Sequence, residues 1–383
     1  MKKTTRFLSL GLALVTSVAL LTGCGGGGAA SSAAPAGSSA AGGSSAAGSG
    51  AAGDYTGKEM ELEVNLSATT NANCQYLLDA FDRITARTGG KVKFKVTMAS
   101  GLLSTKDALE GLGTGVADIS DLTLSNYPES FVYTTQICSQ PFMGFKDIYT
   151  ANDIIRDVLI DHPNELMEGE FKAKNVKVLQ TGAVFGAAFI CKNDISLYKP
   201  TELKGLKVMT NDFVMSKFIN GMGGAAVDHA VTDMYSDLSN GVVDCALNGA
   251  NIAKIFGAIN VSKCLYRFSN DLSTHIKTTC INLDKWNSFD DSLKKIFTEE
   301  MGAPMYKDYM AWVKASEDEQ WKSFEEAPNF KVYDIKDDQI GAWKDAISPY
   351  ANEQLAELKK KNDKVDDAMK IWRDAIDTYY KNH

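Results

Sequence analysis

The side chains that most often carry catalysis are few in this sequence, and they lie far apart. The four histidines stand at positions 162, 229, 275 and 383. The sequence contains no G-x-S-x-G, H-E-x-x-H or P-loop motif, and no group of histidines and cysteines has the spacing of a metal site. We therefore predict that the chain has no catalytic residue, no metal ligand and no cofactor.

Polar side chains that suit binding rather than catalysis follow several predicted strands. Asn71 and Asn73 open a predicted helix, where backbone amides and the helix dipole attract polar groups, although they could equally cap the helix. Thr123 and Asn126 follow the third predicted strand, at the edge where open parallel sheets bind ligands. The amide of Asn248 can both donate and accept hydrogen bonds. We predict that these five residues contact a small molecule.

A seven-residue unit occurs twice and indicates which elements position these side chains. Residues 112–118 read Leu-Gly-Thr-Gly-Val-Ala-Asp, and residues 238–244 read Leu-Ser-Asn-Gly-Val-Val-Asp. Each copy follows a helix-like stretch and precedes a strand-like one, which predicts a helix end, a glycine with positive φ, an anchoring aspartate and a buried strand. Two copies in matching contexts favour two similar α/β lobes over chance similarity, and small ligands bind in clefts between lobes.

The order of elements around the first copy predicts an α/β fold with a mostly parallel sheet. Three strand-like segments alternate with two helix-like ones, and further strands and two long helical blocks follow. The predicted strands are 59–66, 91–98, 118–124, 176–181 and 187–192, and the predicted helices include 74–87, 106–112, 148–166, 290–326 and 337–380.

The N-terminal segment has the features of a bacterial signal peptide. Lys2, Lys3 and Arg6 precede an apolar run over residues 7–21 that is too short to cross a bilayer comfortably. Leu21-Thr22-Gly23-Cys24 then resembles the lipoprotein box, in which the cysteine is diacylated and begins the mature chain. We predict a lipoprotein signal peptide over 1–23 and a membrane anchor of acyl chains such as palmitate on Cys24. An ordinary signal peptide cut nearby is the alternative.

Residues 24–57 are predicted to form the lipidated cysteine and a flexible tether. Residues 25–53 are almost entirely Gly, Ala and Ser, which cannot bury a core and would reach roughly 30 Å. The folded part then begins at residue 58 and is too long for one ordinary core. A formal net charge of −8 without a basic stripe argues against nucleic acid as a partner.

Six further cysteines lack CxxC spacing and mostly have apolar neighbours. We expect buried free thiols, with disulfides as the alternative because an extracytoplasmic location permits oxidation. These residues are Cys74, Cys138, Cys191, Cys245, Cys264 and Cys280.

Several segments, taken together and in order, resemble one protein family. The combination is similar to the substrate-binding protein of a TRAP (tripartite ATP-independent periplasmic) transporter, of the dicarboxylate- and sialate-binding type, over most of the folded chain. No single segment is diagnostic. The matching segments are residues 88–92, Gly101 with 107–118, Gln140-Pro141-Phe142, 203–208, 234–244, Asn248 and Thr274-His275.

The resemblance implies a two-lobed periplasmic-binding-protein fold of the Venus flytrap type, with long C-terminal bracing helices. Lobe I would comprise 58–181 plus 270–312, and lobe II would comprise 182–269 plus 313–383. It also implies an extracytoplasmic protein, anchored to the cell membrane, that captures a small organic solute by lobe closure and delivers it to the membrane subunits of a TRAP permease.

Three other functions remain alternatives. An ABC-type binding protein is disfavoured by the long C-terminal helical block. A ligand-sensing input protein for a membrane receptor and an extracellular enzyme on the same scaffold would use the same lobes. Neighbouring permease genes, a neighbouring sensor kinase or turnover of a bound compound would distinguish them.

Two departures from the family pattern concern the ligand. Relatives usually carry an arginine where this chain has Met209, and a second arginine near the position of Gly186-Ala187-Ala188, which makes Ala187 a candidate contact. A guanidinium suits a buried carboxylate, and closing over an unpaired anion would cost on the order of several kcal/mol. We predict that the usual carboxylate mode is lost or rebuilt, so that the ligand is neutral, cationic, aromatic, or an acid held by backbone amides and hydroxyls. A local alignment slip is the alternative, because other arginines exist: Arg83, Arg87, Arg156 and Arg267.

The remaining candidates for the substrate-binding site come from the same comparison. Phe185 and Met209 would form an apolar wall where relatives carry charge, and Phe142 could form a floor. Tyr235 matches a family tyrosine, and His275 is a hinge candidate. Each has a structural alternative, namely core packing for the apolar residues and the tyrosine, and a satisfied structural role for the histidine.

Overall fold

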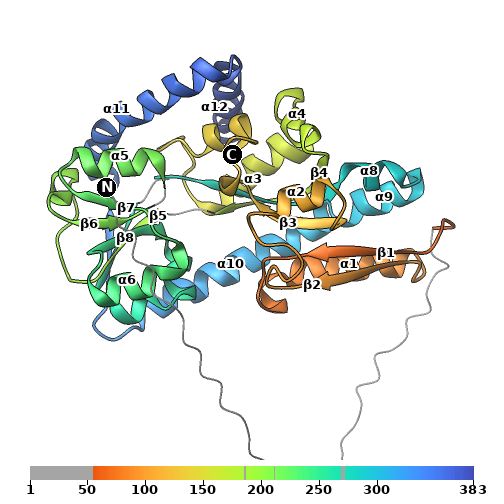
Figure 1. Cartoon of the computed structure of the whole chain (residues 1–383), viewed down its shortest axis with the longest axis horizontal. Coiled ribbons are helices and arrows are strands. Elements are labelled where there is room, and N and C mark those ends of the chain that lie inside the picture. Colours follow the sequence, from red (N-terminus) through yellow and green to blue (C-terminus); the bar gives the residue numbers. More distant parts are fainter. Residues whose placement is uncertain (1–54, 185–186, 211, 269–271) are drawn as a thin grey trace, which may run out of the picture. The chain divides into compact units, whose positions relative to one another are not determined.

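The strands of the chain form two separate mixed sheets, each covered by helices. The computed structural model describes residues 55–184, 187–210, 212–268 and 272–383, and Figure 1 labels their elements. The first sheet has the strand order β2-β1-β3-β10-β4, and the second has the order β11-β9-β5-β8-β6-β7. We call each sheet with its packed helices a lobe. This is the two-lobed α/β fold that the sequence predicts.

The first sheet contains the predicted β-α-β-α-β arrangement. Strands β1 and β2 pair in parallel, as do β1 and β3, while β10 runs antiparallel to both β3 and β4. The strands are β1 (Met60–Asn65), β2 (Val92–Thr97), β3 (Ile119–Thr123), β4 (Val176–Val184) and β10 (His275–Asn282). The helices of this part of the chain are α1 (Gln75–Arg87), α2 (Ala108–Gly113), α3 (Ile148–Arg156), α4 (Glu165–Ala173), α8 (Leu283–Ser288) and α9 (Asp291–Glu300).

The second sheet has a similar parallel core. Strand β6 pairs in parallel with β7 and β8, β5 runs antiparallel to β8 and β9, and β11 runs parallel to β9. The strands are β5 (Ala187–Cys191), β6 (Lys207–Met209), β7 (Ala225–Val227), β8 (Cys245–Gly249), β9 (Cys264–Phe268) and β11 (Lys331–Ile335). The shorter helices are α5 (Phe213–Gly221), α6 (Met234–Asn240) and α7 (Ala250–Ile255).

The repeated seven-residue unit forms the same structure in both lobes. Gly115 and Gly241 both have positive φ, 81° and 71°. Asp118 accepts a hydrogen bond from the backbone N–H of Glu63 at 2.9 Å, and Asp244 accepts one from that of Lys207 at 2.8 Å. In each copy the aspartate therefore joins its own strand to the neighbouring parallel strand, as an anchoring role predicts.

The helix predicted over residues 148–166 is interrupted. Helix α3 ends at Arg156, and a π-helical turn over Asp157–Asp161 leads to His162, whose backbone is no longer helical. Pro163 explains the break, because proline lacks a backbone N–H and disfavours a helical residue before it. Asn164 then starts α4 by accepting a hydrogen bond from the backbone N–H of Met167 at 3.0 Å.

Helix α10 (Ala303–Glu325) contributes to the cores of both lobes. Tyr309 and Val313 pack with the buried residues of α1 and α9, whereas Phe324 packs with those of α6 and α7. A helix of this length spans about 35 Å, enough for one element to serve two cores. This is the bracing helix that the family resemblance implies.

The two C-terminal helices divide between the lobes. In α11 (Asp337–Lys361), Trp343 is buried in the core of the second lobe, with Phe189 and Phe218. In α12 (Val365–Asn382), Trp372 is buried in the core of the first lobe and donates a hydrogen bond to the Tyr133 carbonyl at 3.0 Å. Lobe II was expected to include the whole C-terminal block, but this packing favours placing α12 with the first sheet.

The described cysteines are all buried and free, as expected for small apolar side chains. Cys191, Cys245 and Cys264 are register partners on the neighbouring strands β5, β8 and β9, and the sulfur atoms of Cys191 and Cys245 are 2.9 Å apart. Within the part of the chain that the structure covers, no helix combines the length and apolar character that a membrane crossing requires.

Candidate functional site

The predicted polar residues gather at the carboxyl ends of the parallel strands. On the first sheet, Asn71 and Asn73 follow β1 in a short exposed turn, and Thr123 ends β3, with Asn126 three residues beyond it. On the second sheet, Asn248 lies near the end of β8. Because the ends of parallel strands meet at one edge of a sheet, each lobe has one such edge, and open α/β sheets bind ligands there. Phe185 and Cys24 lie outside the described residues.

The edge of the first sheet carries a charged network that the sequence did not reveal. The carboxylate of Asp121, on β3, accepts a hydrogen bond from the Ser67 backbone N–H at 2.8 Å and a second from the Ser67 hydroxyl. The Lys277 ammonium, on β10, lies 2.9 Å from Asp121 Oδ2 and 3.3 Å from Ser67 Oγ. The side chain of Asp121 is only 7% exposed, whereas that of Lys277 is 37% exposed. The lysine head is thus held in place at a partly open position.

Aromatic residues lie near this network: Tyr309 is buried, and Tyr76 and Trp312 are partly buried. The Tyr76 ring, on α1, lies 5.0 Å from the Tyr309 ring and 5.4 Å from the Trp312 ring. Burial raises the pKa of Tyr76 well above its usual value, and the nearby Tyr309 and Asp121 raise it further. The Tyr76 phenol is therefore neutral at physiological pH.

On the second sheet, Met209 belongs to the core. It is 3% exposed and packs with Met234, Ala246 and Leu265 in the hydrophobic core beside α6 and α7. This placement supports the structural alternative for Met209. The same strand position that would carry a guanidinium in relatives thus holds an apolar side chain that is almost inaccessible.

Asn248 and Ala187 are neighbours on adjacent strands. Asn248 pairs in register with Ala188, and Ala187 pairs with Gly249. Both Asn248 and Ala187 are half-buried, and the Asn248 side-chain oxygen accepts the backbone N–H of Gly249 at 2.9 Å. The structure therefore brings these two predicted contacts together at the edge of the second sheet.

Two exposed aromatic residues stand near the same edge. Tyr235 is the second residue of α6, which follows β7, and it is 46% exposed. Phe213 begins α5, the first helix after β6, and is 54% exposed, with the Lys217 ammonium 4.7 Å from its ring centre. Sequence reasoning missed Phe213; a large apolar residue just after a strand and its helix cap, Asp212, was the available signal.

His275 is half-buried at the start of β10 and interacts with residues from both lobes. Its Nδ1 lies 3.3 Å from the hydroxyl of Ser139. Burial lowers the pKa of His275, and the nearby carboxylate of Asp212, from the second lobe, partly offsets this. The hinge role of His275 stays a prediction, with a satisfied structural role as the alternative.

Phe142 packs against the second lobe rather than in the first. Its ring lies 6.3 Å from the Phe268 ring, and the Lys344 ammonium is 5.4 Å from its centre. Its φ of 56° is unusual for a residue with a side chain, so the surrounding contacts must hold it there. This position supports the core alternative for Phe142.

The four arginines considered as substitutes for the missing guanidinium all pair with acidic groups of the chain itself. Each guanidinium is therefore already partly engaged by a carboxylate of the chain itself. The pairs are Arg83 with Glu300, Arg87 with Glu299, Arg156 with Asp161, and Arg267 with Asp334.

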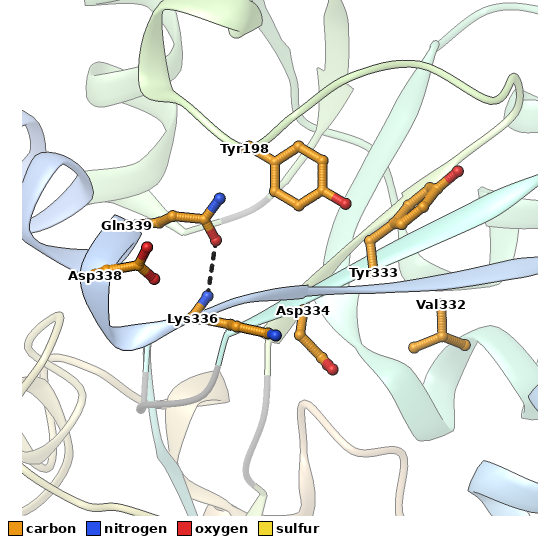
Figure 2. Close-up of a pocket in the computed structure, with 7 residues that line it drawn as sticks. All are labelled: Tyr198, Val332, Tyr333, Asp334, Lys336, Asp338 and Gln339. Carbon is orange, nitrogen blue, oxygen red and sulfur yellow. Dashed lines mark hydrogen bonds between the residues drawn. The ribbon is translucent and has the colours of Figure 1, made fainter.

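Two surface depressions lie away from the predicted site residues. One of ≈ 400 Å³ is lined by residues around β11 and the start of α11, including Tyr198, Tyr333 and Lys336 (Figure 2). The other, of ≈ 330 Å³, lies among α3, α10 and α12 and includes Asp153 and Tyr306. Neither is lined by a predicted site residue. Across the described ranges, no three His, Cys, Asp or Glu side chains gather as metal ligands.

Comparison with known families identifies the class to which this fold and these edges belong. A family model described as bacterial extracellular solute-binding protein, family 7, matches residues 68–358. The match covers most of the chain, so the chain belongs to this family. The TRAP-type resemblance predicted from the sequence is thereby confirmed.

Individual relatives agree with this assignment. A solute-binding protein of Chromohalobacter salexigens is 28% identical over 174 residues, which are 45% of this chain and 49% of that protein. The match therefore spans about half the length of that relative.

Two solved structures share the fold. A marine metagenome TRAP solute-binding protein, specific for aromatic acid ligands and crystallised with 3-hydroxybenzoate, has a TM-score of 0.71 and 19% identity, over 84% of this chain and 99% of that one. A TRAP periplasmic solute-binding protein from Desulfovibrio salexigens, with bound orotic acid, has a TM-score of 0.69 and 17% identity, over 83% of this chain and 99% of that one. The likeness confirms the two-lobed periplasmic-binding-protein fold.

Proposed function

We propose that this chain captures a small organic solute outside the cytoplasm by lobe closure and delivers it to the membrane subunits of a TRAP permease, without catalysing a reaction. The family match over residues 68–358 is the observation that carries this proposal. The corresponding sheet edges of the two lobes support this proposal, because each lobe has polar or aromatic side chains at the carboxyl ends of its parallel strands.

The mechanism we propose is a shift between open and closed lobes. A solute that contacts both edges stabilises the closed state, and the permease would recognise that state. The elements that connect the lobes suit such a motion: α10 enters both cores, and His275 meets both Ser139 and Asp212 at the start of β10.

We further propose that the protein is a lipoprotein, anchored to the outer side of the cell membrane through Cys24. The charged and apolar N-terminal segment and Leu21-Thr22-Gly23-Cys24 support this. The expected mature mass includes acyl chains on Cys24, and it should lose them in Cys24→Ser. A mature chain with an unmodified cysteine would contradict the anchor.

The two solved structures hold 3-hydroxybenzoate and orotic acid, and a small organic solute of similar size is proposed here. A different mode of binding is proposed, because Met209 is buried in the core and the substitute arginines already pair with acidic residues. The arginine clamp is therefore proposed to be absent, and the acid, if the solute is one, must be held by other groups.

Solution scattering of the chain without its signal peptide and Cys24, residues 25–383, tests lobe closure. A thermal-shift screen with carboxylates, neutral metabolites and amines first identifies a compound that raises the melting temperature, because a ligand that binds only the folded state stabilises it. Saturation with that compound should then reduce the radius of gyration. An unchanged scattering curve with a tightly bound compound would contradict closure.

A further inference from the structure

We propose that Lys277, held by Asp121 and Ser67, is the positively charged group that binds a carboxylate of the solute. This inference rests on the proposed function and specifies its ligand. The cation that holds the solute would then lie in the first lobe, whereas the family resemblance implies an arginine in the second lobe.

The geometry around Lys277 leaves part of its ammonium available. An ammonium has three N–H donors. Two are directed to Asp121 Oδ2 at 2.9 Å and Ser67 Oγ at 3.3 Å. The third donor and the 37% exposure of the side chain leave room for a ligand oxygen.

The position of Lys277 is that of the ligand edge. It pairs in register with Thr123 of β3 on one side and with Gly182 of β4 on the other. Ser67 belongs to the segment that leads from β1 to Asn71 and Asn73, so the lysine shares this edge with the polar residues predicted from the sequence. The buried ring of Tyr309 and the partly buried ring of Tyr76 lie close by, where they would contact an apolar part of the solute.

The network favours an anion over a cation. Both oxygens of Asp121 already accept hydrogen bonds or pair with Lys277, and its side chain is only 7% exposed. A ligand ammonium would therefore meet Lys277 first and be repelled. A carboxylate would instead complete the donor set of a cation whose position is already fixed, which reduces the entropy lost on binding.

A second ion pair on the same sheet supplies a matched control. The Lys285 ammonium, on α8, lies 3.0 Å from Asp118 Oδ1, and the two side chains are 34% and 13% exposed. Asp118 also accepts a backbone N–H from β1, as Asp121 accepts one from Ser67. This pair lies at the amino end of β3, far from the ligand edge. Lys285 therefore pairs with an aspartate of the fold, as Lys277 does, but it cannot contact the solute.

The experiment compares Lys277→Met with Lys285→Met in the chain without its signal peptide and Cys24, residues 25–383. A panel of mono- and dicarboxylates, their neutral amides and the matching amines is screened by thermal shift, and the affinity of the best compound is measured by calorimetry. We expect a carboxylate to bind the unaltered chain, Lys277→Met to weaken it at least tenfold, and Lys285→Met to leave it within twofold. Lys277→Arg should restore most of the affinity.

Lys277→Met leaves the buried Asp121 carboxylate without its cation, which could destabilise the fold. The double variant Lys277→Met, Asp121→Asn removes both charges and serves as the folded comparison. It should melt near the unaltered chain and still bind the carboxylate at least tenfold more weakly.

The outcomes separate this inference from the proposed function. Unchanged carboxylate affinity in Lys277→Met and in the double variant overturns the role of Lys277. Preferential binding of amides or amines overturns the carboxylate class. Either outcome leaves solute capture intact. A panel in which no carboxylate binds also overturns the inference. Solute capture by closure fails separately, through unchanged scattering with a bound compound.

Discussion

At the residue scale, Met209 and Asn248, two of the predicted contacts on the second sheet, differ in the accessibility of their side chains. Met209 lies in the core, whereas Asn248 is half-buried at the end of β8 and its amide can still donate to a ligand. We therefore expect Asn248 to be the polar group of this edge that hydrogen-bonds with the solute. The exposed rings of Tyr235 and Phe213 complement it with apolar surface.

Replacing Asn248 tests this selection. We expect Asn248→Ala to weaken binding of the best compound about tenfold, the usual effect of losing one hydrogen bond to a charged or strongly polar group, with little change in melting temperature. Asn240→Ala is the control. Asn240 is an exposed amide of the same lobe and the last residue of helix α6, which precedes β8. Calorimetry measures both. Equal affinities in the two variants would remove Asn248 from the site.

His275 gives the folded chain a predictable response to acid. Burial lowers the pKa of its imidazole below the ordinary 6.5, so below that pH the unfolded chain binds more protons than the folded chain. The contribution of His275 to the free energy of unfolding therefore falls as the pH drops from 6.5 through the pKa of the folded state. His275→Gln should remove this part of the pH dependence in urea unfolding between about pH 7.5 and about pH 5.5.

His162 provides a control with the opposite sign. Its hydrogen bond with Asp157, at 2.6 Å, raises its pKa in the folded chain. The stability that it contributes is present below pH 6.5 and is lost as the pH rises through the pKa of the folded state. His162→Gln should therefore shift the pH dependence in the opposite direction from His275→Gln. Shifts of the same sign would contradict the assignment for His275.

At the element scale, α10 and β4 meet through a glycine. A Cβ atom on Gly182 would lie 2.3 Å from the hydroxyl oxygen of Tyr309. That hydroxyl cannot move aside easily, because Tyr309 is 5% exposed and donates to Asn152 Oδ1 at 3.0 Å. The same Asn152 oxygen accepts the backbone N–H of Ala183 at 2.8 Å. Helix, strand and α3 are therefore fixed together at this point.

Gly182→Ala should consequently destabilise the chain by about 1–3 kcal/mol through overpacking. Gly169→Ala, in the exposed face of α4, has nothing within 4 Å of the added Cβ and should be neutral or stabilise by up to about 1 kcal/mol. Adding Tyr309→Phe to Gly182→Ala removes the clashing oxygen and should recover part of the loss. Urea unfolding measures all three. A Gly182→Ala protein as stable as the unaltered chain would show that α10 and β4 are not rigidly packed here.

At the scale of the whole molecule, two similar lobes share elements that pass between them. Helix α10 enters both cores, α11 packs in the second, and α12 returns to the first. Such shared elements keep two lobes in one functional unit while leaving their ligand edges separate. The family membership, the doubled Asp-anchored turn and these connecting helices together define a binding protein rather than two independent domains.

Much of this architecture follows from local pattern. The alternation around β1, β2 and β3, and the glycine and aspartate of each repeated unit, predict strands, positive φ and anchoring correctly. These features depend on residues close in sequence, and backbone sterics act locally. The interruption of the 148–166 helix was missed although Pro163 signals it.

The sequence by itself determined the fold class and the family, because periodicity, turn residues and motif order are properties of neighbouring positions. Tertiary structure alone decided that Lys277 stands beside Asp121, that Met209 is buried, and that α12 packs on the first lobe. Each of these depends on contacts between segments far apart in the chain. Local pattern does not specify which distant partner a side chain meets; that follows only when the whole chain packs.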